Sequence, residues 1–215
     1  MLFRNKTLIA SACALLFTAP AFAGASLDTL LSGGTIFSNN GKLLFSDFEF
    51  TPILNAPAAS DIEVTTLDDG LLFGSPIEAD SETDTVDYDI SYRVTGIDIE
   101  IDSVFAQSNG SSSGGGEASI YKIIEKEQDQ PLTQITNTFN QGGSISFSSS
   151  SFSPEAYLYV RDEVSVEAND GTAGLSDFSQ TFGTSSISAV PSPTAALAGM
   201  ALLGVIGIRR RRPAK

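Results

Sequence analysis

The chain of 215 residues contains no histidine, no tryptophan and a single cysteine, Cys13. Histidine is the usual base that activates a serine or cysteine nucleophile, and histidine and cysteine supply most transition-metal ligands. Ser119 and Lys122 have the spacing of serine acyl-enzymes, but a strand would point them to opposite faces. A glycosidase needs only two carboxylates, and these are too abundant here for any pair to stand out. These absences predict a protein without catalytic activity.

Basic residues are scarce in the middle of the chain, which carries all 26 acidic residues. Segment 24–189 has a formal charge of −21 because its basic residues are only Lys42, Arg93, Lys122, Lys126 and Arg161. Such a surface repels nucleic acid and anionic lipid headgroups, so we expect no nucleic-acid partner. The segment is long enough for one domain with a sizeable core.

The first 23 residues have the organisation of a secretory signal peptide. Arg4 and Lys6 precede an apolar run at 8–17, and Ala21-Phe22-Ala23 forms a cleavage site for signal peptidase. Cleavage would remove Cys13, so the mature chain would contain no disulfide.

The C-terminal segment, 190–215, has the organisation of a short membrane helix. Ser192 suits the N-cap and Pro193 the first helical position, and an uncharged apolar run follows to Ile208. A helix over 193–208 would be roughly 24 Å long, slightly less than the hydrocarbon core of about 30 Å. The cluster Arg209, Arg210, Arg211 and Arg212 predicts that this end stays in the cytoplasm.

A proline-containing motif, one apolar helix, an arginine cluster and the chain end occur in this order, which resembles a PEP-CTERM sorting signal. The motif falls on Val190, Pro191, Ser192 and Pro193, with serine where the family has glutamate. The resemblance implies an exported protein of a Gram-negative-type bacterium that makes extracellular polysaccharide. It implies processing by an exosortase-type enzyme, passage through the inner membrane, and a final place at the cell surface or in the extracellular matrix.

The domain between these segments shows alternating apolar and polar residues typical of strands. Segment 85–94 is the clearest example, and Asn39-Asn40-Gly41 and Asp68-Asp69-Gly70 indicate two hairpin turns. Eight to ten short strands predict an all-β fold, a single antiparallel β-sandwich of immunoglobulin-like or jelly-roll style, followed by the C-terminal helix.

Three local features refine this prediction. The Ser/Gly run 107–117 has no apolar side chain and predicts a flexible loop. Asp162 falls in phase with apolar residues of segment 156–168, which predicts a bend or bulge beside Arg161. Gly183 is expected to end the domain, 24–183, and a Ser/Thr linker, 184–189, to lead to the tail.

We expect a structural surface or matrix protein first, and a binding module for polysaccharide or calcium is the alternative. Tyr157 and Tyr159 alternate with apolar residues, so one face of this pair is expected to be exposed and available to a polysaccharide. Calcium prefers oxygen ligands, and the densest acidic run is its candidate site, although a solvated acidic face explains the same residues. The candidates are Asp80, Glu82, Asp84, Asp87 and Asp89.

We expect the protein outside the cell to be shorter at both ends than the translated chain. The first cut follows Ala23, where small residues suit signal peptidase. The second falls within 190–194, because a membrane-embedded enzyme reaches only chain at the outer face. The intact mass of the surface-extracted protein measures both cuts. A mass that still includes 195–215 would make the tail a permanent anchor.

Overall fold

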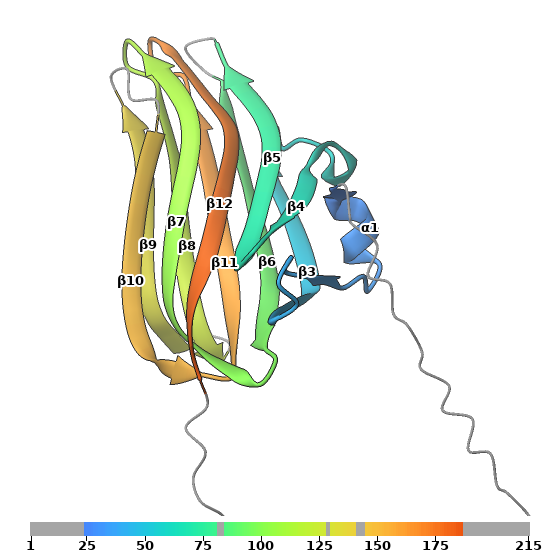
Figure 1. Cartoon of the computed structure of the whole chain (residues 1–215). Helices are drawn as coiled ribbons and strands as arrows, with labels where there is room; N and C mark the ends of the chain where they lie inside the picture. The colour runs from blue at the N-terminus through green and yellow to red at the C-terminus, as the bar shows by residue number, and fades with distance from the viewer. Residues whose placement is uncertain (1–23, 81–83, 128–129, 141–144, 187–215) are drawn as a thin grey trace, which may run out of the picture.

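The computed structural model describes residues 24–80, 84–127, 130–140 and 145–186, which form two antiparallel sheets (Figure 1). The predicted β-sandwich is therefore confirmed, and the helix predicted for 193–208 lies outside the described residues. No helix within the described ranges is long and apolar enough to cross a membrane. The elements are β1 (Ala25–Ser26), α1 (Leu27–Leu31), β2 (Ile36–Phe37), β3 (Leu43–Leu54), the 3-10 helix η1 (Ala59–Asp61), β4 (Glu63–Leu67), β5 (Gly70–Ala79), β6 (Thr85–Gly96), β7 (Ile99–Ser113), β8 (Glu117–Glu127), β9 (Gln130–Asn140), β10 (Ile145–Glu155), β11 (Tyr157–Glu167) and β12 (Thr172–Ser186).

The strand order defines a jelly-roll. Sheet A has the order β1-β4-β5-β12-β7-β10, and sheet B the order β2-β3-β6-β11-β8-β9. The last eight strands pair in a nested way, β5 with β12, β6 with β11, β7 with β10 and β8 with β9. This is the pairing of one long antiparallel ribbon rolled into two layers, so of the two predicted styles the jelly-roll is the one present.

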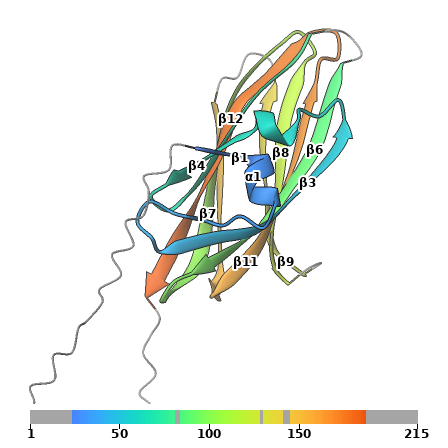
Figure 2. The same ribbon diagram turned by 90° about the vertical axis from the view of Figure 1, so that its right-hand side faces the viewer.

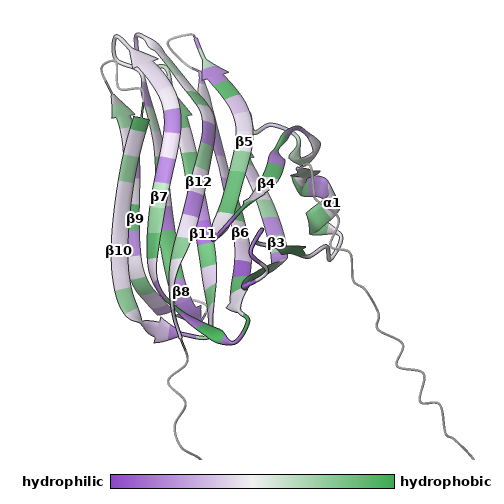
Figure 3. Ribbon diagram, viewed as in Figure 1, coloured by the Kyte–Doolittle hydropathy of each residue, from purple (hydrophilic) through white to green (hydrophobic). Residues whose placement is uncertain are grey.

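The alternation in the sequence matches the two faces of the strands. In β6, Val86, Ile90 and Val94 are buried, whereas Asp87 and Asp89 are only partly covered. The same alternation gives the strands their bands of opposite hydropathy in Figure 3. Both predicted hairpins are present, β2–β3 and β4–β5. Gly41 adopts φ +70° in the first turn, a conformation that favours glycine.

The two long edges of the sandwich are closed in different ways. On one side, α1 buries Leu27 and Leu30 and covers the opening between β4 and β3 (Figure 2). On the other side, β9 and β10 lie against each other, where Thr133 Oγ1 and Ser150 Oγ are 2.6 Å apart. The short helix was not predicted from the sequence, because five residues carry too little periodicity.

The flexible loop predicted for 107–117 is wrong. Most of this run is strand: β7 extends to Ser113, and β8 begins at Glu117. Ser108 is buried and accepts a hydrogen bond of 3.0 Å from the Asn137 amide of β9. A Cβ atom on Gly110 would lie 2.4 Å from the Gly174 carbonyl oxygen of β12. Position 110 is glycine because the neighbouring backbone is too close for a side chain.

The bulge predicted near Asp162 is also wrong. β11 pairs with β6 and with β8 in an unbroken register, and Asp162 is fully buried opposite Lys122. A charged partner at that position, rather than a change of face, explains why the aspartate is tolerated there. The predicted domain end at Gly183 falls too early, because β12 continues to Ser186 and takes in the start of the expected linker.

Replacing Gly110 by alanine is expected to destabilise the protein by about 1–3 kcal/mol, because the new methyl group overlaps the carbonyl of Gly174. Gly74 of β5 is the matched control, since its Cβ would meet nothing closer than 3.8 Å. Gly74→Ala is expected to be neutral or to stabilise by up to about 1 kcal/mol. Urea unfolding of both variants measures the difference, and equal stabilities would contradict the close approach of β7 and β12.

Candidate functional site

A groove of about 470 Å³ lies on the outer face of sheet B. Its lining comes from β3, β6, β11 and β8, which are consecutive strands of that sheet. Strands lie about 4.8 Å apart, so the groove crosses roughly 14 Å of sheet. The lining is acidic, hydroxyl-bearing and aromatic, and consists of Asp47, Glu49, Thr51, Asp89, Ser91, Tyr92, Glu125, Glu127, Tyr157, Tyr159, Val160 and Arg161.

Two tyrosines of β11 form the aromatic part of this groove. Tyr157 and Tyr159 are half-buried and point outward, because Leu158 and Val160 between and after them point into the core. Their ring centroids are 6.0 Å apart and the ring planes meet at 83°. The prediction that the tyrosine face of this strand points outward is therefore confirmed, and the pair lies where four strands contribute polar groups.

Arg93 of β6 holds the tyrosine rings from one side. Its guanidinium carbon lies 4.4 Å from the ring centroid of Tyr157 and 5.9 Å from that of Tyr159. In the sheet, Arg93 is the direct cross-strand partner of Tyr159. A cation over an aromatic face is attracted by the ring quadrupole, so Arg93 restricts the rotation of the Tyr157 ring.

A bulge in β3 points its carboxylates toward the groove. The pairing of β3 with β6 shifts between Ser46 and Glu49, and Asp47 has φ +55°. The shift turns Phe48 into the core, where it stacks on Tyr92 with centroids 5.5 Å apart. Asp47 and Glu49, on either side of Phe48, are exposed and line the groove. Bulges that re-aim side chains are common beside functional sites.

The electrostatics of the groove are dominated by its acids. Partial burial raises the pKa of Asp89, the nearby positive charge of Arg161 opposes this rise, and Asp87 adds to it. Arg161 also contacts Glu163 at 3.3 Å, but both side chains are largely exposed and such a pair contributes little stability. Arg161 is therefore a cation that limits the repulsion on Asp89 from its acidic neighbour.

The calcium candidates do not gather into a cage within the described part of the chain. Asp80 follows β5, Asp84 precedes β6, and Asp87 and Asp89 lie side by side on the outer face of β6. In the described ranges, no three acidic side chains are placed to hold one metal ion. Glu82 lies outside the described residues, so calcium at this run stays a hypothesis.

The sorting residues Val190, Pro191, Pro193, Arg209, Arg210, Arg211 and Arg212 also lie outside the described residues, so the sorting signal stays a prediction. Ser119 is half-buried on the outer face of β8, and Lys122 is buried in the core. This opposite placement agrees with the prediction that they do not form a serine acyl-enzyme pair.

Several groove residues were not singled out by sequence analysis. Asp47 and Glu49 of β3, Ser91 of β6 and Glu125 of β8 come from three further stretches of sequence that only the sheet brings together, and Arg161 follows the tyrosines on β11. The alternation of each strand predicts that these side chains face outward. It does not predict which strands are neighbours, so the groove itself had no sequence signal.

Neither a model of a known protein family nor a curated protein matches this chain. Among solved structures, it is similar to TmCBM61 in complex with β-1,4-galactotriose, with a TM-score of 0.34 and 10% identity over 64% of this chain and 90% of that one. It is also similar to an Arthrobacter globiformis T6 isomalto-dextranase complexed with panose, with a TM-score of 0.30 and 10% identity over 65% of this chain and 21% of that one.

A third similar structure is the enzymatically active domain of tailspike protein 4 from bacteriophage CBA120. The TM-score is 0.31 and the identity 10%, over 64% of this chain and 20% of that one.

Replacing Arg161 by glutamine is expected to raise the pKa of Asp89 further, because the opposing positive charge is lost. A folded pKa above the unfolded value of about 3.9 means that Asp89 favours the folded state at low pH. The stabilisation of the folded state by protonated Asp89 is lost as the pH rises through the folded pKa. In the Arg161→Gln variant this stabilisation extends to higher pH. NMR titration of the Asp89 carboxyl measures the shift. Arg93→Gln, on the same strand as Asp89, is the control, and an unchanged pKa in Arg161→Gln would contradict the assignment.

Proposed function

We propose that this chain is an exported, non-catalytic surface protein whose β-sandwich binds polysaccharide in the groove of sheet B. The observation that carries the proposal is the tyrosine pair, Tyr157 and Tyr159, held by Arg93 in a groove rimmed with carboxylates and hydroxyls. A sugar ring has apolar C–H faces and a rim of hydroxyl groups. Aromatic rings cover the faces, and carboxylates accept hydrogen bonds from the hydroxyls.

The charge of the groove supports a neutral sugar polymer as the ligand. Five carboxylates line the groove, Asp47, Glu49, Asp89, Glu125 and Glu127, against the single guanidinium of Arg161. An anionic polysaccharide would be repelled both by this lining and by the charge of −21 on segment 24–189. The width of roughly 14 Å across four strands suits a segment of a chain rather than one sugar.

A binding role accounts for the site better than catalysis. The sequence has no histidine, and its single cysteine lies in the signal peptide. Partial burial raises the pKa of Asp89 in the groove, and the positive charge of Arg161 opposes this rise. A carboxyl that acts as a catalytic acid generally needs a more protected position.

The signal peptide and the sorting signal expected at the two ends of the chain support a place at the cell surface or in the matrix. Signal peptidase and an exosortase-type enzyme would deliver the domain through the inner membrane to the cell surface or matrix. There the extracellular polysaccharide of the producing bacterium is the natural ligand for the groove.

Replacing Tyr157 and Tyr159 together by alanine is expected to weaken binding to neutral polysaccharide at least about tenfold, or ~1.4 kcal/mol. The aromatic faces that cover the sugar rings are lost, while both positions point away from the core. Retention on immobilised polysaccharide from the producing cells measures the effect.

Tyr121→Ala is the matched control, because Tyr121 lies on the outer face of β8 but does not line the groove. An anionic polysaccharide at low salt is the second control and is expected to be retained less than the neutral one. Equal retention of the double variant and of Tyr121→Ala would show that Tyr157 and Tyr159 do not contribute to polysaccharide binding. No saturable retention of the unaltered protein would leave a purely structural role.

A further inference from the structure

A cluster of polar side chains lies in the core between the two sheets. Lys122 of β8 and Asp162 of β11 are direct cross-strand partners in sheet B, and Gln180 of β12 faces them from sheet A. These three side chains are 2%, 0% and 0% exposed, and Tyr92 beside them is 1% exposed. The proposed polysaccharide site uses none of the three charged or amide groups, so their role is separate.

The contacts join all three groups at one nitrogen atom. Lys122 Nζ donates hydrogen bonds to Asp162 Oδ1 and to Gln180 Oε1. Gln180 Nε2 donates to the hydroxyl of Tyr92. The Asp162 carboxyl and the Gln180 amide therefore lie beside each other, on the same amine. Sheets pack about 10 Å apart, and Lys122 and Gln180 reach toward each other across that gap.

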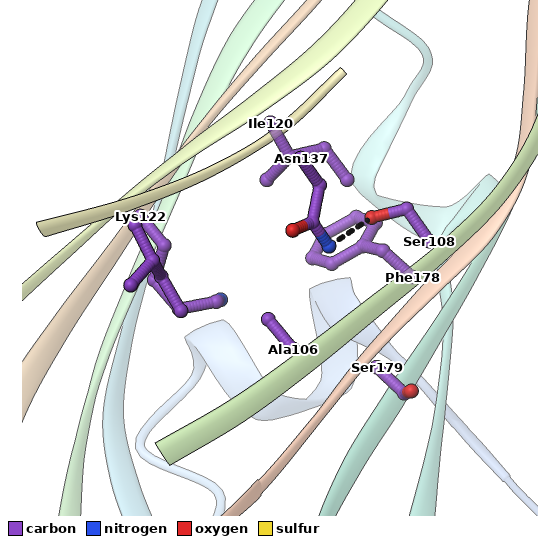
Figure 4. A pocket seen from close by; sticks show the side chains of 8 residues that line it. Ala106, Ser108, Ile120, Lys122, Asn137, Phe178 and Ser179 are labelled. Atoms are coloured by element: carbon purple, nitrogen blue, oxygen red, sulfur yellow. Dashed lines mark hydrogen bonds between the residues drawn. The ribbon is translucent and has the colours of Figure 1, made fainter. Parts of the chain in front are cut away.

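The surroundings disfavour a charged pair. Asp162 Oδ2 is buried without a hydrogen-bond partner among the described residues. Lys122, Phe178 and Ala106 line the space beside the amine (Figure 4). This space has no room for a water molecule. Burial lowers the pKa of Lys122 and raises that of Asp162, although each charge partly offsets the effect on the other. Transfer of the proton from Lys122 to Asp162 gives a neutral amine, which is a nucleophile, and a neutral acid.

We propose that Lys122 and Gln180 become joined by an intramolecular amide bond, with Asp162 as the catalytic acid and base. The crosslink ties β8 of sheet B to β12 of sheet A.

The reaction needs no partner outside the cluster. The lone pair of neutral Lys122 Nζ attacks Cδ of Gln180, and the Asp162 acid donates its proton to Oε1. The Asp162 carboxylate then takes a proton from Nζ and passes it to Nε2. Ammonia leaves with the electrons of the broken Cδ–Nε2 bond, and the carbonyl forms again as Oε1 returns its proton to Asp162. One C–N bond forms, one breaks, and nothing is oxidised or reduced.

Gln180 rather than Asp162 is the acyl partner for a chemical reason. A bond between Lys122 and Asp162 would release water and would need a second acid to protonate the carboxyl. Of the carboxylates in the described ranges, Asp162 is the one that pairs with Lys122, and burial holds the pKa of Tyr92 well above its ordinary value. Asp162 can therefore protonate the Gln180 amide when Lys122 attacks it, whereas no second acid is placed to protonate the Asp162 carboxyl.

The intact mass of the folded, purified protein under denaturing conditions tests the proposal. The unaltered chain is expected to be lighter than its sequence by the mass of one ammonia molecule. Proteolysis is expected to release a branched peptide in which Lys122 is joined to Gln180. A full sequence mass in the unaltered protein would overturn the proposal, whatever the variants do.

Lys122→Met is expected to restore the full mass, and Asp162→Val to leave amine and amide unjoined. Lys126→Met is the matched control, because Lys126 is exposed and pairs with Glu155, so its mass deficit is expected to persist. Cyclisation of the asparagine at Asn40-Gly41 or Asn109-Gly110 also releases ammonia. If the Lys122→Met variant still lacked the mass of one ammonia, the loss would be assigned to such an asparagine and the crosslink would be overturned. A deficit in Asp162→Val would overturn the role of Asp162. If a core variant fails to fold, the branched peptide of the unaltered protein decides.

Discussion

The packing of Tyr92 between the sheets is the interaction on which both the core and the groove depend. Its ring contacts Phe45 and Phe48 of β3 and Phe73 of β5, with centroids 6.1, 5.5 and 5.9 Å apart. These partners come from both sheets, so the ring joins the two layers. Aromatic side chains bury large areas and dominate such cores. The described residues contain no cysteine, so burial of this kind supplies stability there without disulfides.

The same ring connects the core to the outer surface. Phe48 stacks on Tyr92 only because β3 changes its pairing at Asp47, where the backbone adopts a left-handed conformation. That change turns Asp47 and Glu49 toward the groove. The acidic rim beside Tyr157 and Tyr159 is thus a consequence of how the core is filled. A substitution at Phe48 would act on the groove through β3, although Phe48 does not line it.

The hydroxyl of Tyr92 faces the buried cluster of Lys122, Asp162 and Gln180. An unlinked ion pair in this position would be a costly way to hold two sheets together, because desolvation can exceed the attraction between the charges. A neutral amide would remove that penalty and would restrain the unfolded chain as other crosslinks do. The domain would then combine a covalently fixed core with an open acidic face.

The sequence by itself determined the fold class, the outward direction of Tyr157 and Tyr159, and both hairpins. These depend on alternation and on turn residues, which are local properties of the chain. The tertiary structure decided which strands are neighbours, and therefore which carboxylates surround the tyrosines. It also decided that the serine-rich run 107–113 is strand and that Asp162 lies in the core. Gly110 meets the backbone of Gly174, and Asp162 meets the charge of Lys122. Each pair joins strands that are distant in sequence, so no local sequence pattern predicts the contact.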